Sequence, residues 1–152
     1  METLLIGGAP STGKTGAIIW VENYLLSKGF KCVKKIVLNA DFMAILEGKN
    51  KDKKIIRIVI NSASDTEDII DKFYSFMNSN GIYDILISSI RDIYHERDYL
   101  FNKIKPLSKG IVEFPLAKIT RRNDYQKAKA WYDKYVFSML EAVLLNQPFS
   151  VA

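Results

Sequence analysis

The chain has 152 residues, of which 48% are hydrophobic and 26% are charged, the balance of a soluble globular protein and not of a disordered one. A chain of this length can bury one core without disulfides or metals, so we expect a single domain over residues 1–152. The 22 basic and 17 acidic residues leave a net charge of +5 that is scattered along the sequence, which argues against nucleic acid as a partner.

The single cysteine, Cys32, excludes an internal disulfide and is typical of a reducing compartment. We expect its side chain to be buried on a strand. The first residues run directly into an apolar segment, and no apolar run approaches the ~20 residues that cross a bilayer. We therefore expect a cytoplasmic protein without a secretory signal and without a membrane partner.

The most informative segment lies near the amino end. Residues 3–6 are an apolar run that predicts a strand, and apolar residues recur at helical spacing from 17 to 25, before Gly29 ends that helix. Between them the sequence fits the pattern GxxxxGK[ST], which marks a phosphate-binding loop when a strand precedes it and a helix follows it. The residues of this loop are Gly8, Ala9, Pro10, Ser11, Thr12, Gly13, Lys14 and Thr15.

Each part of this loop is suited to a polyphosphate. The glycines let the backbone curl so that successive N–H groups point at the phosphates, and Lys14 would reach the β- and γ-phosphates. The hydroxyl of Thr15 would hold Mg²⁺. The positive amino end of the following helix would add to the attraction.

Beyond this helix the elements alternate in the manner that predicts parallel strands with helical crossovers. We predict strands at residues 32–38, 55–60, 83–87 and 110–114, a short helix at 41–46, and longer helices at about 64–80, 92–104 and 123–145. Ser64 and Glu67 form an S-x-x-E capping box for the first of the longer helices. The last helix carries one apolar stripe that we expect to pack on the sheet, made of Ala128, Trp131, Tyr132, Tyr135, Met139, Ala142 and Val143.

On the motif of residues 8–15, the chain resembles the P-loop NTPase superfamily, and most of all its small nucleoside- and nucleotide-kinase-like group. The resemblance implies a three-layer α/β fold that binds ATP with Mg²⁺. Combined with our strand predictions, it gives a five-stranded, mainly parallel sheet with helices on both faces. In doubly wound folds the ligand lies at the carboxyl ends of the strands, so polar residues there are the candidates for the site.

Two acids are candidates at this edge. In kinases of the superfamily, an acid after the second strand often binds the acceptor hydroxyl, and Asp41 has that position; the alternative is an N-cap for residues 42–46. After the third strand the superfamily usually has a carboxylate for Mg²⁺, but here the strand ends in Asn61. We assign the metal role to Asp65, four residues later, with a first-turn helix charge as the alternative.

Three arginines are candidates for neutralising phosphate charge, since a planar guanidinium donates several hydrogen bonds at once. We assign Arg121 to the transferred phosphoryl group and Arg122 to the nucleotide, and Arg91 is a further candidate. A solvated loop arginine is the alternative in each case. The segment before the last strand is too short for the arginine-rich lid of these kinases, so a lid role would fall to the helix that contains Arg97.

Motifs of other branches are missing: there is no NKxD sequence, no strand that ends in Asp-Glu and no LSGGQ-like segment. Their absence disfavours a GTPase switch, a transporter ATPase and a ring-forming remodeller. The leading prediction is phosphoryl transfer from ATP to a small-molecule acceptor. The alternative is a non-catalytic or slow ATPase module that acts through a protein partner. Phe137, Leu140 and Leu144 lie off the main stripe of the last helix and would form a surface for that partner, with packing on the sheet as the alternative.

Overall fold

The computed structural model describes residues 1–9, 12–118 and 125–152. These residues form an α/β fold around one six-stranded mixed sheet with the order β2-β3-β4-β5-β1-β6. The strands are β1 (Glu2–Gly8), β2 (Lys31–Leu38), β3 (Asp41–Lys49), β4 (Ile55–Asn61), β5 (Ile85–Arg91) and β6 (Gly110–Pro115). The neighbours β4, β5, β1 and β6 are parallel, whereas β3 is antiparallel to both β2 and β4.

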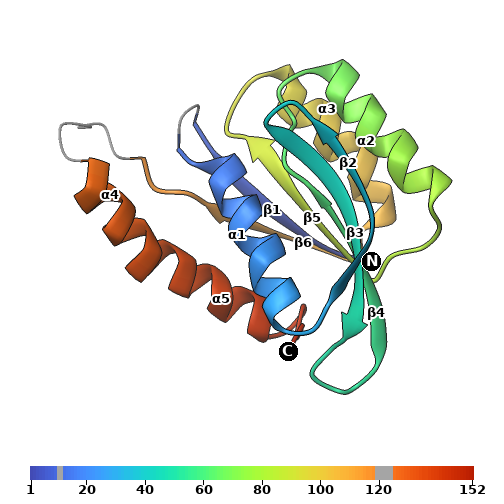
Figure 1. Cartoon of the computed structure of the whole chain (residues 1–152). Coiled ribbons are helices and arrows are strands. Elements are labelled where there is room, and N and C mark those ends of the chain that lie inside the picture. Colours follow the sequence, from blue (N-terminus) through green and yellow to red (C-terminus); the bar gives the residue numbers. More distant parts are fainter. Residues whose placement is uncertain (10–11, 119–124) are drawn as a thin grey trace.

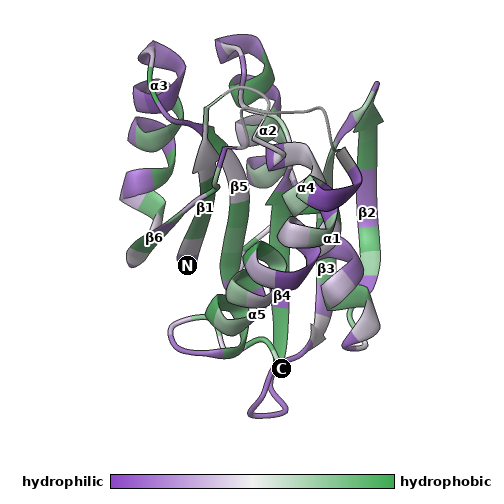
Figure 2. Ribbon diagram, turned by 90° about the vertical axis from the view of Figure 1, so that its left-hand side faces the viewer, coloured by the Kyte–Doolittle hydropathy of each residue, from purple (hydrophilic) through white to green (hydrophobic). Residues whose placement is uncertain are grey.

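The helices cover both faces of this sheet (Figure 1). They are α1 (Lys14–Ser27), α2 (Glu67–Ser79), α3 (His95–Ile104) with the 3-10 turn η1 (Lys105–Leu107), and a carboxyl-terminal run of α4 (Tyr125–Trp131), the π-helical turn η2 (Tyr132–Val136) and α5 (Phe137–Leu145). One core joins α1 and α5 to the sheet, and a second core joins α2 and α3 to its other face. Figure 2 shows the hydrophobic central strands between these two helical layers.

The prediction of a five-stranded, mainly parallel sheet is wrong by one strand. Residues 41–46, expected as a short helix, belong to β3, which pairs with β2 and β4. The side chains of this strand alternate between the two cores: Phe42, Ala44 and Leu46 belong to one, Met43 and Ile45 to the other. A strand that is buried on both faces is apolar throughout, and its sequence then carries no period that separates it from a short helix.

Three local predictions are also corrected. The side chain of Thr66 caps α2 by accepting a hydrogen bond from the N–H of Ile69 at 3.2 Å, so the capping box of Ser64 and Glu67 is wrong. The fourth predicted strand is displaced toward the carboxyl end, because β5 continues through a buried pair of serines to Arg91. Cys32 is exposed, since β2 is an edge strand.

The prediction for the carboxyl-terminal helix is right in part: Tyr132 and Val143 of the predicted stripe pack against the core, but other members of the stripe do not. The buried residues of this helix are Val136, Leu140 and Leu144, whereas Trp131 and Met139 of the predicted stripe are 43% and 62% exposed. A π-helical turn contains one more residue than an α-helical turn, so η2 shifts the phase of every residue that follows it. A stripe predicted with one constant helical period therefore includes the exposed Met139 and leaves out the buried Leu140 and Leu144.

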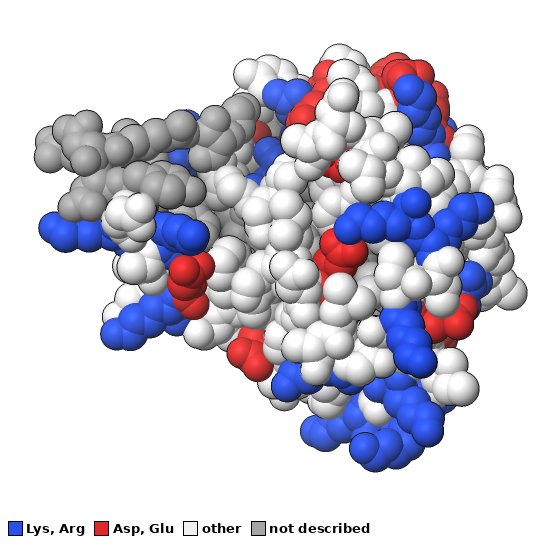
Figure 3. All heavy atoms as spheres, viewed as in Figure 1, with Lys and Arg blue, Asp and Glu red and all other residues white. Residues whose placement is uncertain are grey.

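One group of basic side chains lies away from the phosphate-binding loop. Figure 3 shows lysines at the lower end of the drawn face, where the β3–β4 hairpin lies in Figure 1. This hairpin joins the amino end of β4 to β3 and so lies at the edge of the sheet opposite to the loop. Within the described residues, no helix combines the length and the apolar character needed to cross a membrane.

Candidate functional site

The motif lies where the sequence predicts it, between the end of β1 at Gly8 and the start of α1 at Lys14. Gly13 caps the helix with φ of +88°, a left-handed conformation that favours glycine. A Cβ atom on Gly8 would lie 2.5 Å from Oγ1 of Thr12, so only glycine allows the loop to fold this closely on itself. Pro10 and Ser11 lie outside the described residues.

Lys14 crosses the loop from the first turn of α1. Its Nζ donates hydrogen bonds to the carbonyl oxygen of Gly8 at 2.8 Å and, more weakly, to that of Ala9 at 3.4 Å. Burial lowers the pKa of the Lys14 ammonium; the carboxylate of Asp65 acts against this shift, whereas the guanidinium of Arg91 lowers the pKa further. The ammonium is thus a partly desolvated cation at the carboxyl edge of the sheet. Such a cation donates strong, charge-assisted hydrogen bonds to an anion.

Asp41 contacts Thr15, the residue after Lys14 in the first turn of α1. Its Oδ1 accepts a hydrogen bond from the Oγ1 of Thr15 at 3.3 Å and another from the Oγ of Ser62 at 2.9 Å. The hydroxyl of Ser62 also accepts from the backbone N–H of Phe42 at 2.8 Å, so β4 and β3 together fix the carboxylate. The structure therefore brings Asp41 to the motif's hydroxyl, through a strand that the sequence analysis does not predict.

Asn61, at the position where a metal-binding carboxylate is usual, is committed to the interior. It is 1% exposed, and its Nδ2 donates to the carbonyl oxygen of Ala63 at 2.7 Å and to the Oγ of Ser88 at 3.0 Å. Ser89 continues this network by donating to the carbonyl oxygen of Ser62 at 2.9 Å. Through these contacts Asn61 holds β4 and β5 together at this edge of the sheet.

Asp65, the predicted metal ligand, lies in the segment between β4 and α2, and its side chain is exposed. Its backbone carbonyl accepts a hydrogen bond from Nη1 of Arg91 at 3.3 Å. Its carboxylate reaches the site only as a charge that raises the pKa of Lys14. Of the two predicted acids, Asp41 is the one that contacts the motif.

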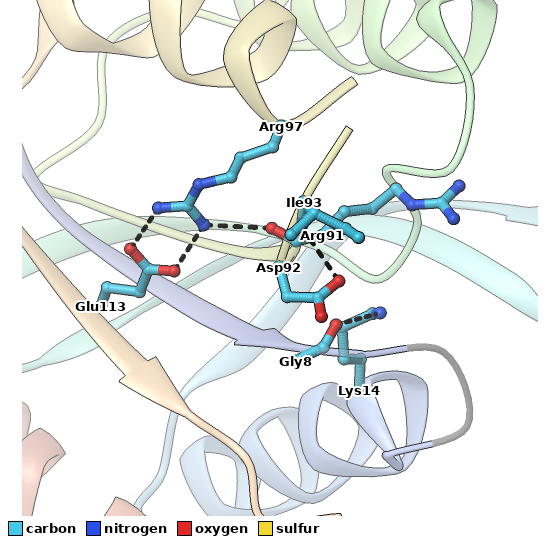
Figure 4. Close-up of polar contacts among 7 residues, drawn as sticks. All are labelled: Gly8, Lys14, Arg91, Asp92, Ile93, Arg97 and Glu113. Carbon is cyan, nitrogen blue, oxygen red and sulfur yellow. Dashed lines mark hydrogen bonds and ion pairs between the residues drawn. The ribbon is translucent and has the colours of Figure 1, made fainter. Parts of the chain in front are cut away.

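The arginines are divided between roles. Arg91 is the last residue of β5, is paired in register with Gly8, and places its guanidinium 5.0 Å from the ring centre of Tyr94. Arg97 forms a two-point ion pair with Glu113 at 2.6 and 2.7 Å and donates to the carbonyl oxygen of Arg91 at 3.0 Å, so it ties α3 to the ends of β5 and β6 (Figure 4).

Arg121 and Arg122 lie outside the described residues. Figure 4 adds Asp92, whose carboxylate lies beside Lys14 while its Oδ1 accepts from the N–H of Ile93 at 3.0 Å. Asp92 is a further charge that raises the pKa of Lys14.

A hollow of about 520 Å³ adjoins Asp41 on the side of α2. Its lining residues include Val37, Leu38, Asp41, Met43, Asn61 and Ile69. Its walls are largely apolar, and the carboxylate of Asp41 is its acidic group. Another hollow, of about 320 Å³, lies at the opposite edge around Glu2, Lys54 and Tyr83, and no residue of the motif lines it.

Two further residues contact the site. Ser62 orients Asp41, and the hydroxyl of Tyr132 donates to the carbonyl oxygen of Thr12 at 3.0 Å. The place of Ser62 at this edge follows from the predicted strand before it, but its contact with Asp41 depends on the unpredicted strand β3. The second contact joins residues 120 positions apart and left no local signal.

No family model, no curated protein and no solved structure matches this chain. Its function is therefore inferred from the geometry of the site.

Proposed function

We propose that this protein belongs with the P-loop NTPases, binds ATP with Mg²⁺ at residues 8–15 and transfers the γ-phosphoryl group to a small-molecule acceptor. The observation that supports this most is the convergence of three groups at the carboxyl edge of the sheet. The glycine loop follows β1, Lys14 and Thr15 begin α1, and Asp41 begins β3. This is the set that a charged, metal-bound triphosphate requires.

Each residue has a role that follows from its place. The N–H groups of the loop and the ammonium of Lys14 would donate hydrogen bonds to the phosphates, because successive backbone N–H groups in such a loop form a concave site for an anion. Mg²⁺ would be held by the oxygens of Thr15 and Asp41 and would offset the charge of the phosphates. Arg91, anchored at the end of β5 next to Gly8, would stabilise charge on the transferred group.

The hollow beside Asp41 is the proposed acceptor site. A hydroxyl there would attack the γ-phosphorus, the bond to the bridging oxygen would break, and ADP would leave. The acceptor's proton would pass to the carboxylate of Asp41 or to water. Since Asp41 both contacts Thr15 and lines the hollow, one side chain connects the two proposed ligands.

The binding part is tested by titrating the protein with ATP in the presence of Mg²⁺. Lys14→Ala removes the cation and should weaken binding roughly 100-fold. Lys54→Ala is the matched control, because this exposed lysine lies on the hairpin at the opposite edge, and it should leave the affinity unchanged. Equal affinities in all three proteins, or no binding by the wild type, would contradict the proposal.

A second candidate, a nucleotide-binding or slow ATPase module that acts through a protein partner, is favoured by one observation. Trp131, Tyr135 and Met139 are 43%, 48% and 62% exposed and follow one another along one face of the carboxyl-terminal helix. Exposed large apolar side chains in a row are typical of a surface that a partner covers.

Labelled ATP separates the two candidates. If the protein transfers the γ-phosphate to a member of a panel of nucleosides, nucleotides and small alcohols, it is a kinase. Phosphate release without any acceptor indicates the ATPase, and binding without either reaction indicates the binding module.

A further inference from the structure

We propose that Tyr132, on the carboxyl-terminal helix, is a positioning residue that turns a peptide of the phosphate-binding loop toward its ligand. This inference rests on the proposed nucleotide binding. Its basis is the hydrogen bond from the hydroxyl of Tyr132 to the carbonyl oxygen of Thr12, 3.0 Å long. Thr12 is itself 4% exposed, and its Oγ1 donates to the carbonyl oxygen of Ala9 at 2.7 Å.

The direction of this carbonyl determines the direction of a donor. The peptide between Thr12 and Gly13 is trans and planar, so its C=O and its N–H point in opposite directions. The hydroxyl of Tyr132 holds the carbonyl toward the carboxyl-terminal helix, and the N–H of Gly13 must therefore point away from that helix. Glycine at position 13 has little intrinsic preference between conformations, so an external contact decides the orientation of this peptide.

The helix is built to supply this contact. Tyr132 is the first residue of the π-helical turn η2, and its neighbours Trp131 and Tyr135 are both exposed. π-helical turns inside α-helices are frequent at functional sites. Here the turn lies where one tyrosine faces the loop while the adjacent aromatic residues face away.

The tyrosine ring is held in place by packing. It lies 6.3 Å from the ring of Phe137, which stacks on Trp20 of α1 at 5.2 Å. Figure 1 shows α4 and α5 running alongside α1, the helix that starts from the loop. Burial raises the pKa of Tyr132, so the hydroxyl keeps the proton that it donates. The ring that makes the contact is thus held by packing between the carboxyl-terminal helix and α1.

The test compares Tyr132→Phe with Tyr135→Phe, which removes a hydroxyl from an exposed tyrosine on the same helix. We expect Tyr132→Phe to weaken the binding of Mg-ATP roughly 3- to 10-fold, the usual effect of one neutral hydrogen bond, and Tyr135→Phe to have no effect. The amide resonance of Gly13 gives a second readout. Its shift on adding Mg-ATP should be large in the wild type and reduced in Tyr132→Phe, while the melting temperature changes little.

The outcomes are distinguishable. The inference is supported if the wild type binds Mg-ATP, only Tyr132→Phe weakens this binding, and the shift of the Gly13 amide resonance is reduced in that variant. Wild-type binding that both variants retain, or a loss of affinity that merely follows a loss of folding, overturns the inference and leaves the proposed function intact. No binding by the wild type overturns both.

Discussion

The two halves of the sheet differ in how they carry the candidate site. The parallel half, β4-β5-β1-β6, holds the phosphate-binding loop at the end of β1 and buries Asn61 of β4 against Ser88 of β5. The antiparallel half, β2-β3, has an edge strand that is exposed along its whole length, yet it supplies Asp41 to the hydroxyl of Thr15.

In the proposed function, this difference separates the phosphate-binding role from the acidic role. Where a carboxylate is usual, at the end of β4, the residue is an amide that ties strands together. The acid instead enters from the first residue of a strand that runs in the opposite direction. Each half can therefore be disturbed by itself.

The largest effect is expected from Asn61→Asp, which introduces a carboxylate at the end of β4 in the parallel half. A carboxylate cannot donate the two hydrogen bonds that Nδ2 makes, and at 1% exposure its charge would be buried without a partner. We expect the free energy of unfolding to fall by about 3 kcal/mol, measured by urea denaturation.

Asn39→Asp, the same change in the exposed β2–β3 turn, is the control and should leave the stability nearly unchanged. If Asn61→Asp instead folds normally and binds Mg-ATP more tightly, the metal site lies at β4 and our division of the sheet is wrong.

The next effect concerns the antiparallel half. Asp41→Asn removes the carboxylate that accepts from Thr15 and Ser62, and we expect the affinity for ATP in the presence of Mg²⁺ to fall roughly 10- to 100-fold. Asp65→Asn should have a much smaller effect, because this exposed carboxylate acts on the site only as a charge near Lys14. A larger loss from Asp65→Asn would restore Asp65 as the metal ligand.

The pH dependence of binding sharpens the role of Lys14. Burial lowers the pKa of its ammonium from 10.5, so the cation is lost at a lower pH than for an ordinary lysine. We expect affinity for Mg-ATP to decline as the pH rises, and the decline to begin at a lower pH than the deprotonation of an ordinary lysine. Lys14→Arg keeps its charge over the same rise in pH and should give a flat profile at whatever affinity it retains. A flat wild-type profile would show that the ammonium does not bind the ligand.

The smallest effect is expected at α1, which supports the parallel half. Burial, and then the charge of Glu141, raise the pKa of Tyr24 from 10.0 to about 12. Between these values the folded protein keeps a proton that the unfolded chain releases, so the free energy of unfolding should fall as the pH rises. Tyr24→Phe should remove part of this decline, and Tyr135→Phe should not. Identical denaturation curves at pH 11 for wild type and Tyr24→Phe would contradict this.

The sequence predicts the parallel half better than the antiparallel half, for physical reasons. The loop from Gly8 to Thr15 needs glycines, a lysine and a hydroxyl at fixed spacing, and local spacing is what a sequence displays directly. The place of Asp41 depends on the pairing of β3 with β4, and the apolar residues of β3 show no period. The contact of Tyr132 with Thr12 depends on a π-helical turn, which shifts the helix phase without a residue that marks it.

The most direct test of the central claim is a crystal structure with a non-hydrolysable ATP analogue and Mn²⁺ in place of Mg²⁺. Our account expects the triphosphate to lie within the loop of residues 8–15, with an anomalous peak at coordination distance from Oγ1 of Thr15 and next to the carboxylate of Asp41. A triphosphate bound elsewhere, or a metal peak at Asp65 remote from Asp41, would contradict it.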